Sequence, residues 1–342
     1  MKPCLTLAGI LAAILINPVP ALADKKPGFP ALSQVPKTPQ LKNDHKATKF
    51  CFIVAGDNRP ADKDSPQPQA LSQIFNDAQQ FKPAFFLWSG DIIYGHEAHK
   101  EKLEAQYKEF FGIAQLAKAA VFNAPGNHEM DTVQDLPNQK IETPDPELHK
   151  HYLHFMQYSK GAPAYGGFDY GNSRFIALDT EEVGAPPAPT PTATPEKKLK
   201  LDPGFVSDEQ MKLLKHDLEA NKAKAHIFVF MHHPIKPLKS SSGLNRANAT
   251  ALQDLFSNYP NVSYVIAAHE HLYFNATGAG LTDPASSGPS YLVSGGAGAP
   301  LDNCHAAANC VAANHYLMFN VNGDAVTFQM QQLPTTTAAA SR

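Results

Sequence analysis

Five short segments of this chain place carboxylate, amide or imidazole side chains directly after an apolar run. They are Gly56-Asp57-Asn58-Arg59, Gly90-Asp91-Ile92-Ile93-Tyr94, Gly126-Asn127-His128-Glu129, Met231-His232-His233-Pro234 and Ala268-His269-Glu270-His271. The apolar runs predict buried strands, and loops at the carboxyl ends of such strands converge to form sites in α/β proteins. Oxygen ligands mixed with imidazoles favour iron, manganese, zinc or cobalt over calcium or magnesium. The segments therefore predict a transition-metal site at one edge of a sheet.

A single segment of this kind would be weak evidence, because Gly-Asp is common at turns and a His-x-His pair can be two solvated residues. The five segments, however, all stand at the same point relative to a predicted strand. This shared position is what favours a site over five unrelated turns.

The elements that must position these residues follow from the apolar periodicity. Strands are predicted at residues 50–55, 84–88, 119–124, 174–178, 226–231, 262–267, 291–293, 316–321 and 325–330. Helices are predicted at residues 69–81, 97–117 and 208–220, the last one preceded by Ser207 as N-cap in a capping-box pattern with Gln210. Strands that alternate with helices favour an α/β core.

Composition excludes several classes of protein. The chain has 342 residues, with 29 Lys and Arg against 32 Asp and Glu, and 43% of its residues are hydrophobic. It is therefore neither a largely disordered chain nor a polybasic nucleic-acid binder. No apolar run reaches the length of about eighteen residues that a membrane-spanning helix needs.

The ends of the chain and one internal segment differ in composition from the rest. Residues 1–23 combine Lys2, an apolar stretch and a terminal Ala-Leu-Ala, which predicts a signal peptide cleaved after Ala23 and a periplasmic or secreted protein. Residues 24–48 read as an irregular lead-in and residues 333–342 as a flexible tail. One domain is expected at residues 49–332, with a Pro/Thr-rich surface insertion at residues 184–195.

Three cysteines would remain after cleavage at Ala23, namely Cys51, Cys304 and Cys310. Cys304 and Cys310 close a short loop and are the expected disulfide in an oxidising compartment. Cys51 lies in an apolar run, where a free thiol behaves as a small hydrophobic group. A zinc cluster around His305 is the alternative, but a fourth ligand at suitable spacing is missing.

The complete set of segments resembles the calcineurin-like metallophosphoesterases, whose motifs follow the order D-x-x, GD, GNH[DE], a lone His and GHxH. The resemblance covers residues 49–330 and implies a four-layer αββα sandwich of two mixed β-sheets flanked by helices, with a dinuclear metal site at the strand ends. It implies metal ligands at Asp57, Asp91, Asn127, His232, His269 and His271. Asp91 would bridge both metals, and His128 would act on the transition state without binding metal.

The choice of His232 over His233 rests on the same resemblance together with geometry. Successive side chains of an extended segment point in opposite directions, so the two rings should not both face the metals. His232 fits the M-H-x-P form of the family.

Two positions depart from the usual family pattern. Arg59 stands where most members carry His, and Tyr94 stands where many carry Asp. The purple acid phosphatase branch shows the same exchange and binds a ferric ion through the tyrosine, although Arg59 and Ala268 both replace a glycine of that branch. Tyr94 is therefore either a phenolate ligand to Fe(III) or an aromatic wall of the pocket. Arg59 either clamps a phosphate oxygen or forms a salt bridge beside the metal ligands.

The resemblance implies an exported hydrolase that cleaves phosphate monoesters of a small-molecule substrate by attack of metal-bound hydroxide, as acid phosphatases do. The cofactors would be two metal ions, Fe(III) with Fe, Zn or Mn as the second. Hydrolysis of phosphodiesters or nucleotides on the same metals is one alternative. A metal-holding binding module without turnover is the alternative from another class.

Structural rather than catalytic roles are expected for several other residues near the segments. His96, Glu97 and Glu129 fit helix-start or solvated roles, with a place in the pocket wall as the alternative. His315 is expected to be a packed strand residue. The glycines of residues 294–298 would let the backbone pass close to the site.

Overall fold

The fold was analysed in a computed structural model, which describes residues 40–42, 44–96, 100–136, 139–156, 163–182 and 204–334. The signal peptide and the Pro/Thr-rich insertion predicted from the sequence lie outside these residues. Within them, no helix is both long and apolar enough to cross a membrane.

One sheet has five strands in the order β14-β13-β1-β2-β3. Its members are β1 (Lys49–Ala55), β2 (Phe85–Trp88), β3 (Ala120–Asn123), β13 (His315–Asn322) and β14 (Ala325–Gln332). β1, β2 and β3 run parallel, whereas β13 pairs antiparallel with β1 and with β14. The carboxyl ends of β1, β2 and β3 therefore meet at one edge, as the sequence predicts for the first three motifs.

The second sheet has seven strands in the order β12-β10-β11-β9-β8-β7-β6. They are β6 (Gly166–Tyr170), β7 (Ser173–Ala177), β8 (His226–Phe230), β9 (Val262–Ala267), β10 (Tyr273–Asn275), β11 (Ser290–Ser294) and β12 (Cys310–Val311). β7, β8, β9 and β11 are parallel neighbours. A separate hairpin joins β4 (Asp131–Leu136) to β5 (Gln139–Pro144).

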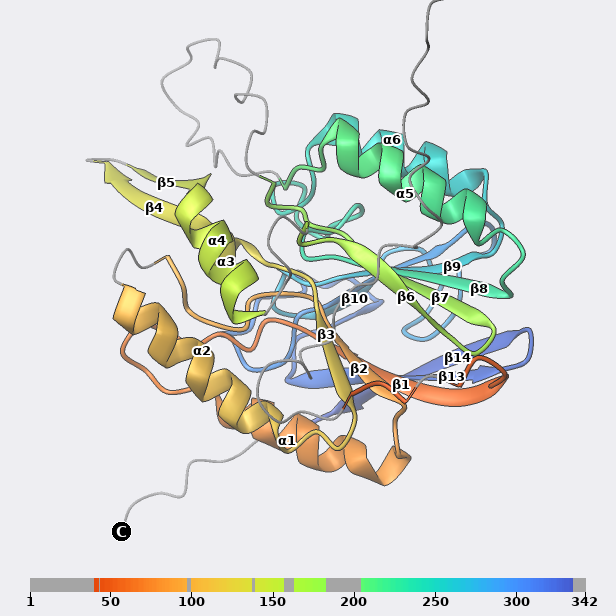
Figure 1. Cartoon of the computed structure of the whole chain (residues 1–342), viewed down its shortest axis with the longest axis horizontal. Coiled ribbons are helices and arrows are strands. Elements are labelled where there is room, and N and C mark those ends of the chain that lie inside the picture. Colours follow the sequence, from red (N-terminus) through yellow and green to blue (C-terminus); the bar gives the residue numbers. More distant parts are fainter. Residues whose placement is uncertain are drawn as a thin grey trace, which may run out of the picture.

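Helices cover the outer face of each sheet (Figure 1). α1 (Gln69–Asp77) and α2 (Lys100–Ala114) pack on the five-stranded sheet, and α5 (Asp208–Ala220) and α6 (Arg246–Ser257) pack on the seven-stranded sheet. Two further helices, α3 (Asn127–Met130) and α4 (Pro146–Phe155), lie at the edge near the β4–β5 hairpin. The architecture is thus the four-layer αββα arrangement expected from the sequence.

Three apolar layers hold the sandwich together. Phe52 and Val54 of β1 face the second sheet and pack in one cluster with Phe228 and Phe319, while Ile53 faces α1 and α2. This division follows from the two-residue repeat of a strand, because alternate side chains point to opposite faces. β1 is buried on both faces, so its sequence reads as one continuous apolar run.

Most predicted elements are present with small shifts at their ends. Ser207 caps α5 by accepting a hydrogen bond from the Gln210 amide at 3.2 Å, as predicted. The predicted helix at residues 69–81 is α1 followed by a 3-10 turn, η2 (Ala78–Phe81), since Lys82 takes a left-handed conformation before Pro83. The helix predicted at residues 97–117 ends at Ala114, and its first three residues are outside the described part.

The structure contains elements that the sequence analysis does not predict, notably α4, α6 and the β4–β5 hairpin. Leu41 of the predicted lead-in packs against the apolar cluster between the two sheets. Leu333 is 5% exposed and donates its amide to the Asn314 carbonyl, so the packed domain extends to the start of the predicted tail.

The predicted disulfide is present, with Cys304 and Cys310 joined and Cys51 free. The Cys51 thiol is half-buried and contacts the Phe81 carbonyl at 3.1 Å. Both cysteines needed for a zinc cluster around His305 are therefore used in the disulfide.

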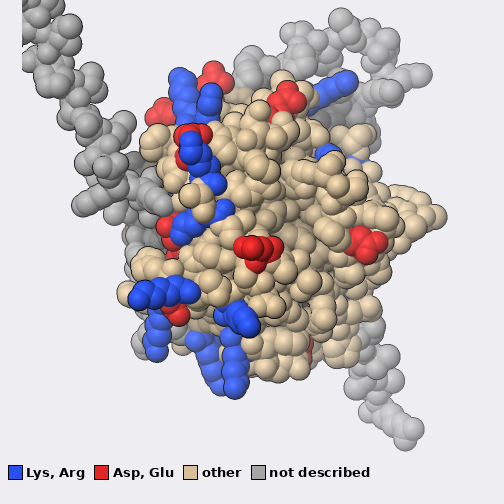
Figure 2. Space-filling model, turned by 90° about the vertical axis from the view of Figure 1, so that its right-hand side faces the viewer, with Lys and Arg blue, Asp and Glu red and all other residues tan. Residues whose placement is uncertain are grey.

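The β13–β14 turn lies at the end of the molecule opposite the carboxyl ends of β1, β2 and β3. Figure 2 shows this end, where Lys and Arg gather along one side with Asp and Glu among them, and an acidic side chain lies near the middle of the face. Such a face lacks the continuous basic surface that nucleic-acid binding requires.

Candidate metal centre

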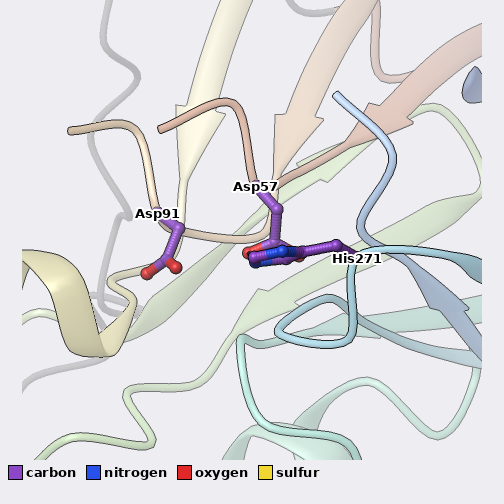
Figure 3. Close-up of side chains that lie close together, drawn as sticks. All are labelled: Asp57, Asp91 and His271. Carbon is purple, nitrogen blue, oxygen red and sulfur yellow. The ribbon is translucent and has the colours of Figure 1, made fainter. Parts of the chain in front are cut away.

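Two aspartates follow neighbouring parallel strands and lie side by side. β1 ends at Ala55, which pairs with Trp88 at the end of β2, and Asp57 and Asp91 follow within three residues. Figure 3 shows both carboxylates and His271 pointing into one space. One ligand atom from each of these three side chains lies within 4.8 Å of the others.

The backbone at this edge is held in an uncommon conformation. Asp57, Asp91 and His269 have φ angles of 60°, 53° and 69°. Residues other than glycine rarely adopt this left-handed region, and it costs on the order of 1–3 kcal/mol where the surroundings impose it. The Asp57 amide donates to the Gly90 carbonyl at 3.1 Å, which fixes the two turns to each other.

A second group of side chains comes from the later motifs. The Asn127 Oδ1 atom lies 2.9 Å from His232 Nε2 and 3.2 Å from His269 Nδ1. The two histidine nitrogens are 3.1 Å apart. Asp91 joins both groups, because its Oδ1 atom is 3.3 Å from His232 Nε2 while its carboxylate also belongs to the group with Asp57.

Three of these proposed ligands are oriented by a hydrogen bond on the side of the group away from the site. His232 Nδ1 donates to the Ser89 carbonyl at 2.8 Å, and His271 Nδ1 donates to the Pro300 carbonyl at 2.7 Å. In both rings the unprotonated Nε2 therefore faces the aspartates. Asn127 donates its amide to Glu142 Oε2 at 3.2 Å, which turns its oxygen toward the imidazoles. Such outer contacts orient ligands in metal sites.

The buried carboxylates of the site lack enough donors within the protein, which favours the binding of cations. Asp57 is fully buried and neither of its carboxylate oxygens has a hydrogen-bond partner among the described residues. Burial and the neighbouring Asp91 raise its pKa well above the ordinary value. Burial alone would also raise the pKa of Asp91, but positive charge from His232, His128 and Arg59 brings it below its usual range. When two carboxylates share a site and no cation neutralises both, the pKa of one rises while the pKa of the other stays low.

The imidazoles are suited to coordination. Burial lowers the pKa of His232 to about 4, and burial followed by Arg59 lowers the pKa of His271. Both rings are therefore neutral near pH 7 and carry a free lone pair. The unpaired Asp57 carboxylate and these lone pairs fit a metal centre, with Asp57, Asp91 and His271 on one side and Asn127, His232 and His269 on the other.

His128 lies beside this centre. Its Nδ1 donates to the Tyr94 carbonyl, and its Nε2 is 3.8 Å from Asp91 Oδ2. The His96 ring packs on it with centroids 4.0 Å apart, and His96 Nδ1 bonds to the Asp131 carbonyl at 2.8 Å. His96 thus has a place in the wall of the site, the alternative that the sequence analysis leaves open.

Arg59 and Tyr94 occupy different surroundings. The Arg59 Nε atom is 3.6 Å from Asp91 Oδ2, so its guanidinium enters the site directly. The Tyr94 ring lies against the rings of His128 and His96, at centroid distances of 5.6 and 6.4 Å. Whether its phenol oxygen binds metal stays a prediction.

His233 lies outside the six converging side chains, with its ring packed against His269 at a centroid distance of 4.1 Å. Its Nδ1 is 2.5 Å from Glu181 Oε1 and 3.2 Å from the Thr180 hydroxyl. These partners come from the segment after β7 and make His233 a support for the neighbouring His232.

Glu129 holds the backbone that carries the proposed ligands, a role that was not predicted from the sequence. It lies in the first turn of α3, as expected, but it is 1% exposed rather than solvated. Its carboxylate accepts hydrogen bonds from the backbone amides of Asp91, Ile92, Ile93 and Gly126, at 2.7–3.2 Å. It therefore fixes the second and third motifs together. Its place directly after His128 is the one sequence signal that could have indicated this role.

Asn58 and Glu270 act in the same manner. The Asn58 side chain accepts from Trp88 Nε1 at 2.7 Å and donates to Gln67 and to the Ile92 carbonyl. Glu270 accepts from the backbone amides of residues 238 and 239 at 2.7 and 2.6 Å. Both are buried polar residues inside the motifs, and each directly follows a proposed ligand in the sequence.

The glycine-rich turn passes close to Asp57, as predicted. The Ala297 and Ala299 amides donate to the carbonyls of Gly56 and Asp57 at 3.0 and 2.8 Å. A Cβ on Gly295 would lie 2.2 Å from Asp57 Oδ2, so any larger residue would collide with the proposed ligand. His315 is a buried residue of β13, as expected, and bonds to Ser294 at 3.1 Å.

Comparisons with known proteins agree with this geometry. The family model for calcineurin-like phosphoesterases matches residues 52–273. A protein of Vibrio vulnificus named 3',5'-cyclic adenosine monophosphate phosphodiesterase CpdA is 29% identical over 206 residues, covering 58% of this chain and 58% of the relative. A Pseudomonas aeruginosa protein of the same name is 28% identical over 109 residues, or 31% of this chain and 34% of that protein. The chain thus spans less than two thirds of either curated relative.

Solved structures share the fold at low sequence identity. The purple acid phosphatase PPD1 from yellow lupin (Lupinus luteus) seeds matches with a TM-score of 0.60 and 16% identity, covering 84% of this chain and 52% of the lupin chain. A dimetal phosphatase from Danio rerio matches with a TM-score of 0.56 and 17% identity, covering 83% of this chain and 99% of that one. Since the family model spans more than half of the chain, the protein belongs to the calcineurin-like phosphoesterases, a family of metal-dependent phosphoric ester hydrolases.

Proposed function

We propose that this protein hydrolyses phosphate monoesters at a dinuclear metal centre. The observation that carries the proposal is the convergence of six side chains from five separate segments, in which Asp91 joins the two groups and Asp57 is buried without a hydrogen-bond partner among the described residues. Asp57, Asp91 and His271 would hold one metal, and Asn127, His232 and His269 the other, with Asp91 shared. When bound, two cations lower the pKa of water and offset the charge that builds up at phosphorus.

The remaining residues would orient the ester and the leaving group. Arg59 places a guanidinium 3.6 Å from Asp91, where it can bind a non-bridging phosphate oxygen. The extra positive charge matches the two negative charges of a monoester better than the single charge of a diester. His128 is fixed through the Tyr94 carbonyl with its Nε2 on the Asp91 side, in a position to assist departure of the alcohol.

A second candidate is hydrolysis of phosphodiesters, including cyclic nucleotides. It is favoured by the names of the two curated relatives, which are both cyclic AMP phosphodiesterases. The same proposed ligands would serve either reaction, so the difference between the candidates lies in Arg59 and the shape around it.

The decisive experiment compares p-nitrophenyl phosphate, its bis-ester and cyclic AMP as substrates of the protein loaded with iron and a second dication. We expect fastest turnover of the monoester, lost in Asn127→Ala and retained in Asn258→Ala, an exposed asparagine at the end of α6. Preferred cleavage of the bis-ester or cyclic AMP would replace the monoester proposal. No hydrolysis of any substrate by the metal-loaded protein would favour a binding module instead.

Tyr94 as a ligand to Fe(III) is part of this proposal. A ferric phenolate absorbs visible light, so the iron-loaded protein should be coloured and Tyr94→Phe should lose the colour while retaining the fold. An unchanged visible spectrum in Tyr94→Phe would make Tyr94 an aromatic wall beside His128, as its ring contacts alone indicate.

Export to the periplasm or beyond is also proposed. It is supported by the signal-like pattern of residues 1–23 and by the Cys304–Cys310 disulfide, because disulfides persist in oxidising compartments. The mass of the protein recovered from periplasm or medium tests it, since cleavage after Ala23 predicts Asp24 as the first residue.

A further inference from the structure

A second cavity lies apart from the metal centre, between α4 and α5. Its volume is about 560 Å³, which is in the range of small-molecule sites. Its lining includes three acidic residues, Asp179, Glu182 and Glu209, and two basic residues, Lys150 and His149, and burial lowers the pKa of His149. The Lys150 ammonium is engaged at 2.5 Å by Glu147, outside the lining. The cavity wall is therefore strongly acidic.

The deepest of these carboxylates is unsatisfied. Asp179 is 1% exposed and its Oδ1 accepts from the Glu181 amide at 2.8 Å. Its Oδ2 has no hydrogen-bond partner among the described residues. A buried carboxylate is costly unless a cation or donor meets it. Burial and the nearby Glu182 raise the pKa of Asp179 to about 7. The described part of the fold therefore provides no donor or cation for the Asp179 Oδ2 atom.

An aromatic side chain completes this wall. Burial together with Glu182, Glu209 and Asp179 raises the pKa of Tyr165 to about 12, so all three carboxylates act on the same phenol group. An aromatic face beside several carboxylates is the combination that recognises ammonium ions, through the negative face of the ring and direct charge attraction.

An apolar cavity of about 220 Å³ adjoins the acidic one. The two share Tyr165 and Leu213, and the apolar cavity is further lined by Ile176, Leu178 and Leu214. A ligand that fills both would have a cationic end and an apolar body.

A metal ion does not fit this cavity. Among the described residues, the only group of acidic, histidine or cysteine side chains close enough to hold an ion is Asp57, Asp91 and His271. The three carboxylates of the cavity therefore do not converge closely enough to coordinate one metal ion together.

We propose that the cavity between α4 and α5 binds an organic ammonium ion with an apolar body, its charge facing Asp179, Glu182 and Glu209 and its body lying between Tyr165 and Leu213. The site is separate from the proposed catalytic function. It nevertheless adjoins the metal centre through the chain, because Glu181, between Asp179 and Glu182, contacts His233 at 2.5 Å.

Isothermal titration of the metal-loaded protein with benzyltrimethylammonium tests the proposal. We expect saturable binding of one cation per chain, and no binding of the neutral benzyl alcohol at the same concentrations. Glu209→Gln should weaken binding on the order of tenfold, the effect of losing one charged contact. Asp208→Asn is the matched control, because Asp208 has the same charge in the same helical turn but lines another surface; its affinity should equal that of the wild type.

Asp179→Asn provides a second variant in which only the buried charge is removed, and it should weaken binding at least as much as Glu209→Gln. Asn127→Ala should bind benzyltrimethylammonium like the wild type, which separates this site from the metal centre. Absence of saturable binding, or equal affinity in the wild type, Glu209→Gln and Asp179→Asn, would overturn the proposal. Displacement of the probe by calcium chloride at equimolar concentration would overturn the assignment to an organic cation.

Discussion

Two buried aspartates of this fold have opposite surroundings. Asp217 of α5 is 7% exposed, and Arg174 of β7 donates to its two oxygens at 3.0 and 2.6 Å. Asn221 adds a third hydrogen bond at 2.6 Å. Asp57 is buried more completely, yet neither of its oxygens has a hydrogen-bond partner among the described residues, and the imidazole nitrogens of His232 and His271 come no closer than 3.9 Å.

The difference shows how to separate structural from functional charge in this molecule. A buried carboxylate without a partner is destabilising, so a fold normally supplies one. At Asp217 the chain supplies an arginine and an asparagine, and the group stabilises the contact between β7 and α5. At Asp57 the chain supplies no donor, and a cation from outside must do so.

The largest expected effect comes from replacing the unpaired carboxylate. Asp57→Asn should lower phosphoesterase activity by about 10³-fold or more, since metal coordination contributes several kcal/mol to transition-state stabilisation. In the metal-free protein the same change should raise the urea midpoint, because it removes an unpaired buried charge. A metal-free Asp57→Asn that unfolds more easily than the wild type would contradict this comparison.

Removal of Arg174, the partner of Asp217, should lower the stability of the protein rather than its activity. Arg174→Met leaves Asp217 buried with only its asparagine contact and should cost about 3–5 kcal/mol of unfolding free energy, measured in urea. Lys222→Met is the control, because Lys222 forms an exposed pair with Glu219, and its urea midpoint should match the wild type. If Arg174→Met unfolds like this control, the pair is not structural.

A buried histidine gives the comparison a pH dependence. Burial lowers the pKa of His315 to about 4 from the ordinary 6.5. Stability from this group is therefore complete above pH 6.5, where both folded and unfolded chains are neutral. As the pH falls toward 4 the unfolded chain takes up the proton first, and about 3 kcal/mol is lost. Unfolding in urea between pH 7 and 4.5 should show a smaller loss for His315→Gln than for the wild type; equal losses would assign the effect to other groups.

The smallest of these effects is expected at Glu129, a carboxylate of the metal region whose partners the chain does supply. Glu129→Gln puts an amide donor against backbone amides that also donate. Because Glu129 orients the turn that carries Asp91, metal affinity should fall about 10- to 100-fold with the fold retained. Equilibrium dialysis against zinc measures this, and an unchanged affinity would remove Glu129 from the set of positioning residues.

Much of the fold can be predicted because its signals are local. The apolar run before Asp57 predicts β1, and the spacing of Ser207 and Gln210 predicts the start of α5, since hydrogen bonds in a helix cap span only three residues. α6 is harder to predict, although Ala249, Leu252 and Phe256 lie on its buried face, because Asn248 and Thr250 in its first half have weak helix propensity.

The residue types of the candidate site were likewise predictable, whereas their supports were not. Asp57, Asp91, Asn127, His232, His269 and His271 each follow an apolar run, so position relative to a strand indicates them. Glu129 carries no such signal for its backbone partners, which lie up to 38 residues away. The function of a buried acid depends on which distant segment meets it.

The sequence by itself determined which polar side chains follow the strands, that Cys304 and Cys310 are paired, and that His232 rather than His233 joins the proposed ligands. These properties follow from the two-residue repeat of strands and from short loops. Only the tertiary structure decided that Asp217 meets Arg174 across 43 residues, that Asp57 meets no donor, and that three carboxylates surround one cavity. Partners of buried charges are set by how sheets and helices pack, and no local pattern in the chain records that packing.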